Sequence, residues 1–262
     1  MDIVNVYFTD GYIEWGKLFI KSYTYHHGED DLMIVFTRNL NNNQIREVAN
    51  LRGNIEIRNK NLNFDKLSKN AGINKNILIR YKSETESEKV STSNKVWKLM
   101  IAGDDRIKQI YELINERDEG DNILHFDADT YIQKNVSELW KELKQNDFST
   151  IFRINKQIKR RGKIFRENRA TLICAMGFTV NDRCKEFVKR WIYYIDKIKP
   201  SQRKKGYGQT SCYYAYKDMN KKYKDFKWGQ FRDKRGKLWM NANKGHKDKL
   251  LVKAQHNFKS VK

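Results

Sequence analysis

Two aspartates, Asp127 and Asp129, are the residues whose type and spacing most clearly suggest chemistry. They follow an apolar run, residues 123–126, which has the length and composition of a buried strand. The backbone turns where a strand ends, so two carboxylates one residue apart can converge there. Carboxylate oxygens are ligands that Mg²⁺ and Mn²⁺ prefer, and these cations keep further positions for phosphate and water. The pair therefore predicts a divalent-cation site.

A cation held in this way could bridge the two phosphates of a nucleotide-diphosphate sugar. It would neutralise the charge that develops on the diphosphate as the glycosidic bond breaks. The alternative interpretation is a solvated turn in which Asp127 caps the helix expected from near Ser137. The position after a strand favours the site, because ligands of open α/β sheets bind outside the carboxyl ends of the strands.

The elements that must position this pair alternate between strand and helix in the first half of the chain. Alternation of this kind predicts a parallel sheet covered by helices, because parallel strands need crossover connections. Residues 59–94 are polar and are expected to hold one short helix and a mobile loop. Strands are expected at 3–9, 32–37 and from 55, and helices at 13–25, 43–51 and 96–115.

The second half is less regular. It is expected to contain strands at 149–154 and 171–180, a helix at 183–198, and a helical run after the basic loop 199–207. The tail from residue 228 is expected to be loop-rich with short strands. Together the two halves predict an α/β fold with a mostly parallel sheet.

Residues 122–140 resemble the DxD segment of the GT-A glycosyltransferases, especially family 8 and related small bacterial and viral enzymes. The shared pattern is an apolar strand, Asp-x-Asp, and an asparagine step leading to Leu-Trp. The matching residues are Asp127, Asp129, Thr130, Asn135, Leu139 and Trp140. The resemblance implies a single GT-A domain over 1–262, with a nucleotide-sugar-binding half (1–140) and an acceptor half with a closing segment (141–262). It also implies that the donor is a nucleotide-diphosphate sugar, with a UDP sugar as the first candidate.

The same resemblance assigns residues for donor binding. Phe8, Thr9 and Asp10, at the end of the first strand, become candidates for contact with the base and ribose. Lys95 and Lys98 lie on the helix where the family often carries a basic residue facing the donor. The alternative for both lysines is an ordinary position on a helix surface.

The sequence also departs from the family pattern. The family's Asn-Ala-Gly step falls at residues 175–177, where the asparagine is missing, and its Asp-Gln pair falls at 208–209, where only Gln209 remains. The family's His-x-x-Gly-x-x-Lys segment has its nearest match in residues 241–247. Gly245 and Lys247 there suit a close approach to phosphate. His246 is the predicted third metal ligand, and Asn243 and His256 remain alternatives.

The stereochemistry is left open by these departures. An inverting enzyme needs a carboxylate base to take the proton of the acceptor hydroxyl, and Asp182 and Glu186 are the candidates. A retaining enzyme could work without a separate base, with Gln209 near the face of the sugar. The resemblance favours retention.

The chain is strongly basic, with a formal net charge of +21 and a pI near 9.7. Two basic segments, 156–169 and 197–205, lie close to aromatic residues, which suits a polyanionic acceptor. Nucleic acid, including DNA with a hydroxylated base, and anionic glycan are the acceptors considered. The alternative is a lysine-rich composition that only maintains solubility.

Other functions compete with sugar transfer. A non-catalytic nucleic-acid-binding protein would explain the charge but not the position of the aspartates, and the sequence has no recognisable nucleic-acid-binding signature. A metal-dependent nucleotidyltransferase or nuclease could use the same pair. Three widely spaced cysteines, no signal peptide and no long apolar segment predict a cytoplasmic protein with reduced thiols.

Overall fold

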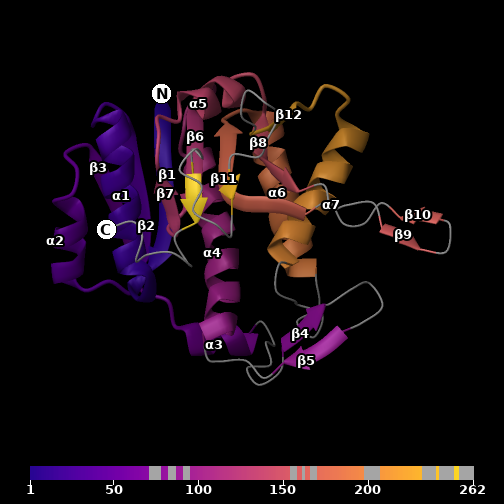
Figure 1. Cartoon of the computed structure of the whole chain (residues 1–262), viewed down its shortest axis with the longest axis horizontal. Helices are drawn as coiled ribbons and strands as arrows, with labels where there is room; N and C mark the ends of the chain where they lie inside the picture. The colour runs from indigo at the N-terminus through magenta and orange to yellow at the C-terminus, as the bar shows by residue number, and fades with distance from the viewer. Residues whose placement is uncertain are drawn as a thin grey trace.

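A seven-stranded sheet forms the centre of the computed structural model, in the order β12-β8-β11-β6-β1-β2-β3 (Figure 1). The structure describes residues 1–70, 78–81, 87–90, 95–153, 158–160, 163–165, 170–197, 207–231, 240–241 and 251–253. The strands of this sheet are β1 (Asp2–Thr9), β2 (Leu32–Arg38), β3 (Ile55–Lys60), β6 (Asn122–Asp127), β8 (Phe148–Arg153), β11 (Ala170–Thr179) and β12 (Trp228–Gln230).

Most neighbouring strands of the sheet run parallel. β1 pairs in parallel with β2 and β6, β2 pairs in parallel with β3, and β12 pairs in parallel with β8. Only β11 runs against its neighbours, β6 and β8. We call the edge at which β1, β2 and β6 end the carboxyl edge, and the edge at which they begin the amino edge. The prediction of a mostly parallel α/β sheet is confirmed.

Helices cover both faces of the sheet and bury two apolar cores (Figure 1). The helices of one face are α4 (Lys95–Asn115), α6 (Asp182–Lys197) and α7 (Tyr207–Lys222), and those of the other are α1 (Ile13–His27), α2 (Asn42–Ala49) and α5 (Ser137–Leu143). Alternate side chains of β1 enter opposite cores, as the period of two requires: Ile3 and Tyr7 face α4, whereas Val4, Val6 and Phe8 face α1. Two of the buried residues, Cys184 and Cys212, are free thiols.

Several smaller elements lie outside the main sheet. They are η1 (Asp10–Tyr12), α3 (Phe64–Asn70), the hairpins β4 (Leu78–Tyr81) with β5 (Ser87–Val90) and β9 (Ile158–Arg160) with β10 (Lys163–Phe165), and a small sheet of β7 (Thr130–Ile132), β14 (Leu251–Lys253) and β13 (Met240–Asn241). The hairpins were not predicted from the sequence. In the described part of the chain, no helix combines the length and apolar character needed to cross a bilayer.

One polar pair interrupts the core between β1 and β6. His125 Nδ1 lies 2.6 Å from Asn5 Oδ1, and both side chains are fully buried. The amide nitrogen of Asn5 donates to the Ile34 carbonyl at 2.8 Å, so its oxygen faces the ring and Nδ1 must carry the proton. Burial, with help from the nearby Arg106 charge and against the opposing effect of Asp127, lowers the pKa of His125 to about 3.

Replacing His125 with asparagine should reduce the loss of folding stability that occurs as the pH falls below 7. The native ring stays neutral down to about pH 3, whereas an unfolded histidine takes up a proton near pH 6.5. The unfolded state therefore binds more protons in this window, and stability present above pH 6.5 is lost as the pH falls towards 3. Between pH 7 and pH 4, the free energy of unfolding measured in urea should fall by up to about 3 kcal/mol more for the wild type than for the variant. Equal losses would contradict a buried neutral His125.

Candidate active site

The predicted metal pair lies at the carboxyl edge of the sheet. Asp127 is the last residue of β6 and is paired with Tyr7 of β1, and the chain turns through Ala128 and Asp129 into β7. Asp127 keeps some exposure, at 18% of its side chain, whereas Asp129 is buried. The strand end thus holds both carboxylates where ligands of open α/β sheets bind.

The alternative role for Asp127, capping the next helix, is wrong. α5 begins at Ser137 and its N-cap position is Val136, nine residues after Asp127 in the chain. The backbone N–H of Ser137 instead donates to the Asn135 side chain at 2.8 Å. Asn135, one of the residues that match the family pattern, therefore has a local structural role.

Arg106 of α4 forms an ion pair with Asp127. The two groups come from segments 21 residues apart, and both side chains are mostly buried. Partial burial strengthens their attraction relative to a pair on the open surface. The carboxylate of Asp127 thus already has a cation beside it.

A second set of contacts fixes α4 to the ends of β1 and β2. Asp105, the neighbour of Arg106, accepts hydrogen bonds from the Tyr7 hydroxyl at 2.9 Å and from Arg38 Nε at 2.7 Å. Arg38 is wholly buried, and its guanidinium also donates to the Thr37 carbonyl at 2.7 Å. Burial, reinforced by the Asp105 carboxylate, raises the pKa of Tyr7, so this hydroxyl remains a donor. Three strand ends and one helix therefore hold Arg106 against Asp127.

Sequence reasoning missed Tyr7, Arg38, Asp105 and Arg106. Charged residues in the middle of an amphipathic helix are usually solvated, and Arg38 follows a strand that otherwise reads as apolar. A signal did exist in retrospect: the polar run 103–106 occupies one turn of a helix that is otherwise rich in apolar residues.

The donor-binding residues predicted at the end of β1 are only partly available. Thr9 and Asp10 are at the carboxyl edge, and Asp10 Oδ1 accepts the Gly11 N–H at 2.9 Å. Phe8 is instead buried under α1, and a Cβ on Gly16 would lie 2.4 Å from its ring. Its position on the inward-facing side of β1 therefore corrects the prediction that its ring contacts a base.

The predicted base Asp182 is at the opposite edge of the sheet. β11 runs against β6, so Thr179 faces Asn122 at the amino edge, and α6 begins at Asp182 shortly afterwards. Five strand steps of about 3.3 Å separate that edge from Asp127, or roughly 17 Å. Glu186, one turn further along α6, pairs with Arg190. The sequence did not reveal the antiparallel direction of β11. This direction places Asp182 and Glu186 away from the predicted metal pair.

Gln209 lies near the start of α7, towards the carboxyl edge. The indole N–H of Trp191, beyond the middle of α6, donates to the Gly208 carbonyl at 2.8 Å. α7 then runs back to the amino edge, where β12 begins beside Phe148. Gln209 is thus on the same side of the molecule as Asp127.

The basic residue of α4 nearest the pair is not the predicted one. Lys95 is the first residue of α4, 11 residues before Arg106, or about 16 Å along a helix. Lys98 is exposed and lies over the Phe64 ring, with Nζ 5.9 Å from its centre. Arg106 is therefore the basic residue of α4 beside Asp127, and a role for Lys95 or Lys98 facing the donor stays a prediction.

The predicted phosphate and third-ligand residues, Gly245, Lys247 and His246, lie outside the described residues, as do Asn243 and His256. The strands before and after the segment 242–250 are nevertheless close to the pair. β14 pairs with β7, placing Lys253 opposite Thr130, and β13 pairs with β14. Within the described ranges, no three metal-ligating side chains gather, so Asp127 and Asp129 would need a ligand from elsewhere.

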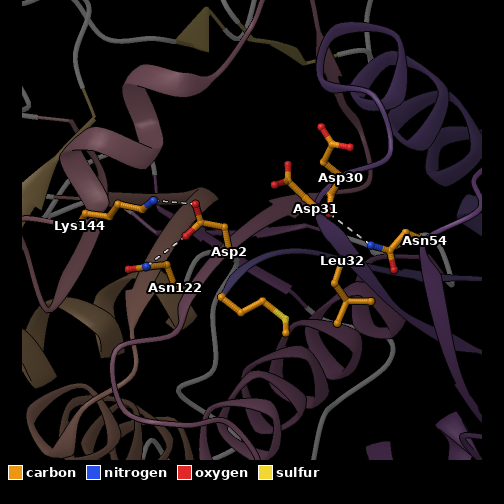
Figure 2. A pocket seen from close by; sticks show the side chains of 8 residues that line it. Asp2, Asp30, Asp31, Leu32, Asn54, Asn122 and Lys144 are labelled. Atoms are coloured by element: carbon orange, nitrogen blue, oxygen red, sulfur yellow. Dashed lines mark hydrogen bonds and ion pairs between the residues drawn. The ribbon is translucent and has the colours of Figure 1, made fainter.

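A hollow of about 610 Å³ lies at the amino edge, far from the aspartate pair (Figure 2). Figure 2 shows that three carboxylates, Asp2, Asp30 and Asp31, line it. Lys144 pairs with Asp2 at 2.7 Å, and Asp31 accepts the Tyr23 hydroxyl at 2.7 Å. An acid-lined hollow would repel a diphosphate, so the carboxyl edge remains the candidate active site.

Solved structures share the fold of this chain, whereas no protein-family model and no curated protein matches the sequence. The galactosyltransferase LgtC, in complex with donor and acceptor sugar analogues, is 15% identical with a TM-score of 0.52, over 82% of this chain and 70% of that one. Mouse xyloside xylosyltransferase 1, in its apo form, is 8% identical with a TM-score of 0.54, over 98% of this chain and 99% of that one. At such identities the likeness concerns the fold. The chain therefore has the GT-A fold that the resemblance of residues 122–140 implied.

Proposed function

We propose that this chain is a metal-dependent glycosyltransferase that moves a sugar from a nucleotide-diphosphate sugar to an acceptor hydroxyl. The observation that carries the proposal is the position of Asp127 and Asp129 at the carboxyl end of a central strand in a GT-A fold. Residues 1–140 would form the donor half and residues 141–262 the acceptor half and closing segment.

The residues at this edge fit a divalent cation. Two carboxylates adjoin one turn, and the Arg106 guanidinium already stands as a cation against Asp127. Within the described part of the chain, Thr130 Oγ1 and Arg106 Nε are buried without a hydrogen-bond partner, which leaves an acceptor and a donor unused beside the pair. Mn²⁺ or Mg²⁺, when bound, would neutralise charge on the diphosphate. His246 is the proposed third ligand, with Asn243 and His256 as alternatives.

The chain's own groups would assist the departure of the diphosphate. Arg106 can donate to a phosphate or sugar oxygen, since a guanidinium offers five N–H groups and Asp127 occupies only some of them. Gly245 and Lys247 are proposed to hold the phosphates, and Thr9, Asp10 and Lys95 the nucleoside or its phosphates. UDP is the first nucleotide to test.

The position of Asp182 supports retention over inversion. Asp182 and Glu186, the two carboxylates considered as bases, lie towards the amino edge, so neither is a candidate base beside Asp127. In a retaining transfer the acceptor proton can pass to an oxygen of the departing diphosphate as the new bond forms. Gln209 is proposed to lie beside the sugar during this step.

The acceptor is proposed to be a polyanion. The net charge of +21 and the basic segments of the acceptor half support nucleic acid or an anionic glycan over a neutral one. A non-catalytic nucleic-acid-binding protein, a nucleotidyltransferase and a nuclease are the competing functions.

Replacing both aspartates tests the proposal against these alternatives. In Asp127→Asn/Asp129→Asn, Mn²⁺-dependent hydrolysis and transfer from a panel of nucleotide sugars should fall by at least about 100-fold, because the carboxylate charge is lost. Wild type should also gain thermal stability with Mn²⁺ and UDP, and the double variant should not. Wild type that neither binds nor cleaves any nucleotide sugar, while it cuts nucleic acid, would favour a nuclease.

Replacing Arg106 with methionine should tighten Mn²⁺ binding by about 10-fold. The change removes both a competitor for Asp127 and a positive charge beside the cation, and each effect favours the metal. Arg117→Met, two residues after the end of α4 near the amino edge, should leave binding unchanged. Titration of Mn²⁺ followed by electron paramagnetic resonance measures both affinities. Weaker binding in Arg106→Met would show that the arginine supports the site rather than competes for it.

A further inference from the structure

Four tyrosine rings form a row on the outer surface of α6 and α7. Neighbouring ring centres are 5.4 Å apart for Tyr193 and Tyr194, 5.6 Å for Tyr194 and Tyr214, and 6.4 Å for Tyr214 and Tyr213. We call these four residues the tyrosine row. The packing of α6 on α7 does not depend on these rings alone, because other residues, such as Trp191 and Ala215, form the buried core between the helices and the sheet.

Two rings of the row are exposed, and the row is anchored at its Tyr213 end. Tyr193 is 55% exposed and Tyr214 45%, and they are two of only four large apolar or aromatic side chains so exposed among the described residues. Tyr213 contacts Tyr216 at 6.2 Å, and Tyr216 packs on Trp228 at 4.4 Å. The rings are therefore held in place, which lowers the entropy lost when a ligand stacks on them.

The surroundings of the row are cationic. Lys197 Nζ lies 5.3 Å from the centre of the Tyr193 ring, and Lys217 Nζ lies 5.9 Å from that of Tyr213. Between these two lysines the sequence contains four more basic residues and no acidic one. The flanking acids are in ion pairs: Asp196 pairs with Lys108, and Asp218 with Arg190. The exposed tyrosine rings therefore lie beside positive charges that attract anions.

The row also lies on the side of the molecule that carries the aspartate pair. It is formed by the last turns of α6 and the first half of α7, and the end of α6 and the start of α7 lie towards the carboxyl edge. Gln209 lies about one turn before Tyr213 on α7. A chain bound along the row could therefore extend towards the candidate active site.

We infer that the tyrosine row binds a single-stranded nucleic acid, which carries the acceptor of the proposed transfer. Bases would stack on Tyr193 and Tyr214, and the lysines would hold the phosphates once drawn off the ring faces. Every nucleotide offers a flat ring and a negative charge, which matches this alternation of aromatic and basic groups. A duplex hides its bases from such rings, whereas a single strand exposes them. The inference rests on the proposed function for its biological meaning.

Binding of a fluorescent dT20 strand to the full-length chain tests the inference by anisotropy. Tyr193→Ala/Tyr214→Ala should weaken binding by at least about 10-fold, since stacking contributes strongly for each base. The dependence of affinity on salt should be unchanged, because no charge is removed. Tyr193→Phe/Tyr214→Phe should bind as wild type does, because it keeps the rings. Tyr25→Ala, a matched control with 85% exposure on α1, should also bind as wild type does.

Several results would overturn the inference. The first is unchanged dT20 binding by the double alanine variant while circular dichroism shows it folded. The second is an equal loss in Tyr25→Ala. The third is an equal loss of heparin binding, which would indicate an acidic glycan. Donor hydrolysis by wild type, measured in parallel, separates the two proposals: dT20 binding without hydrolysis refutes sugar transfer, and hydrolysis without ring-dependent binding refutes only this inference.

Discussion

The ion pair between Arg106 and Asp127 is the contact on which the candidate active site depends. It joins the helix α4 to the end of the central strand β6, and Asp105 holds that helix in turn through Tyr7 and Arg38. Burial makes these contacts strong when complete and costly when one partner is missing. The position of α4 at the carboxyl edge is therefore fixed before any ligand arrives, and only the Arg106 guanidinium needs to turn from Asp127 towards a bound ligand.

The same edge combines groups of opposite sign for different purposes. Asp127 and Asp129 suit a hard cation, while Arg106 suits an anionic or hydroxyl oxygen. The pairing of β14 with β7 brings the C-terminal region beside this turn, although the two strands are more than a hundred residues apart in sequence. A donor bound there would meet residues from the beginning, middle and end of the chain. Such a site forms only when the whole chain is folded.

The sequence predicted most of the first half because the periodicity there is strong. The strands β1, β2 and β6 and the helix α4 are close to their predicted ranges, and the edge that holds Asp127 followed from strand direction. It could not reveal that β11 runs against β6, since a strand's direction depends on its partners, and this alone separates Asp182 from the site. Nor could it show that Phe8 faces the α1 core or that Arg106 meets Asp127, because both depend on long-range packing.

The central claim is that Asp127 and Asp129 hold one divalent cation together with a nucleotide diphosphate. A crystal structure of the wild-type chain grown with Mn²⁺ and UDP tests it most directly. The account predicts anomalous density for manganese bound by both carboxylates and by the diphosphate, with the Arg106 guanidinium turned from Asp127 towards the ligand. The claim would be contradicted by a structure in which the two carboxylates point apart with no metal between them and Arg106 is still paired with Asp127.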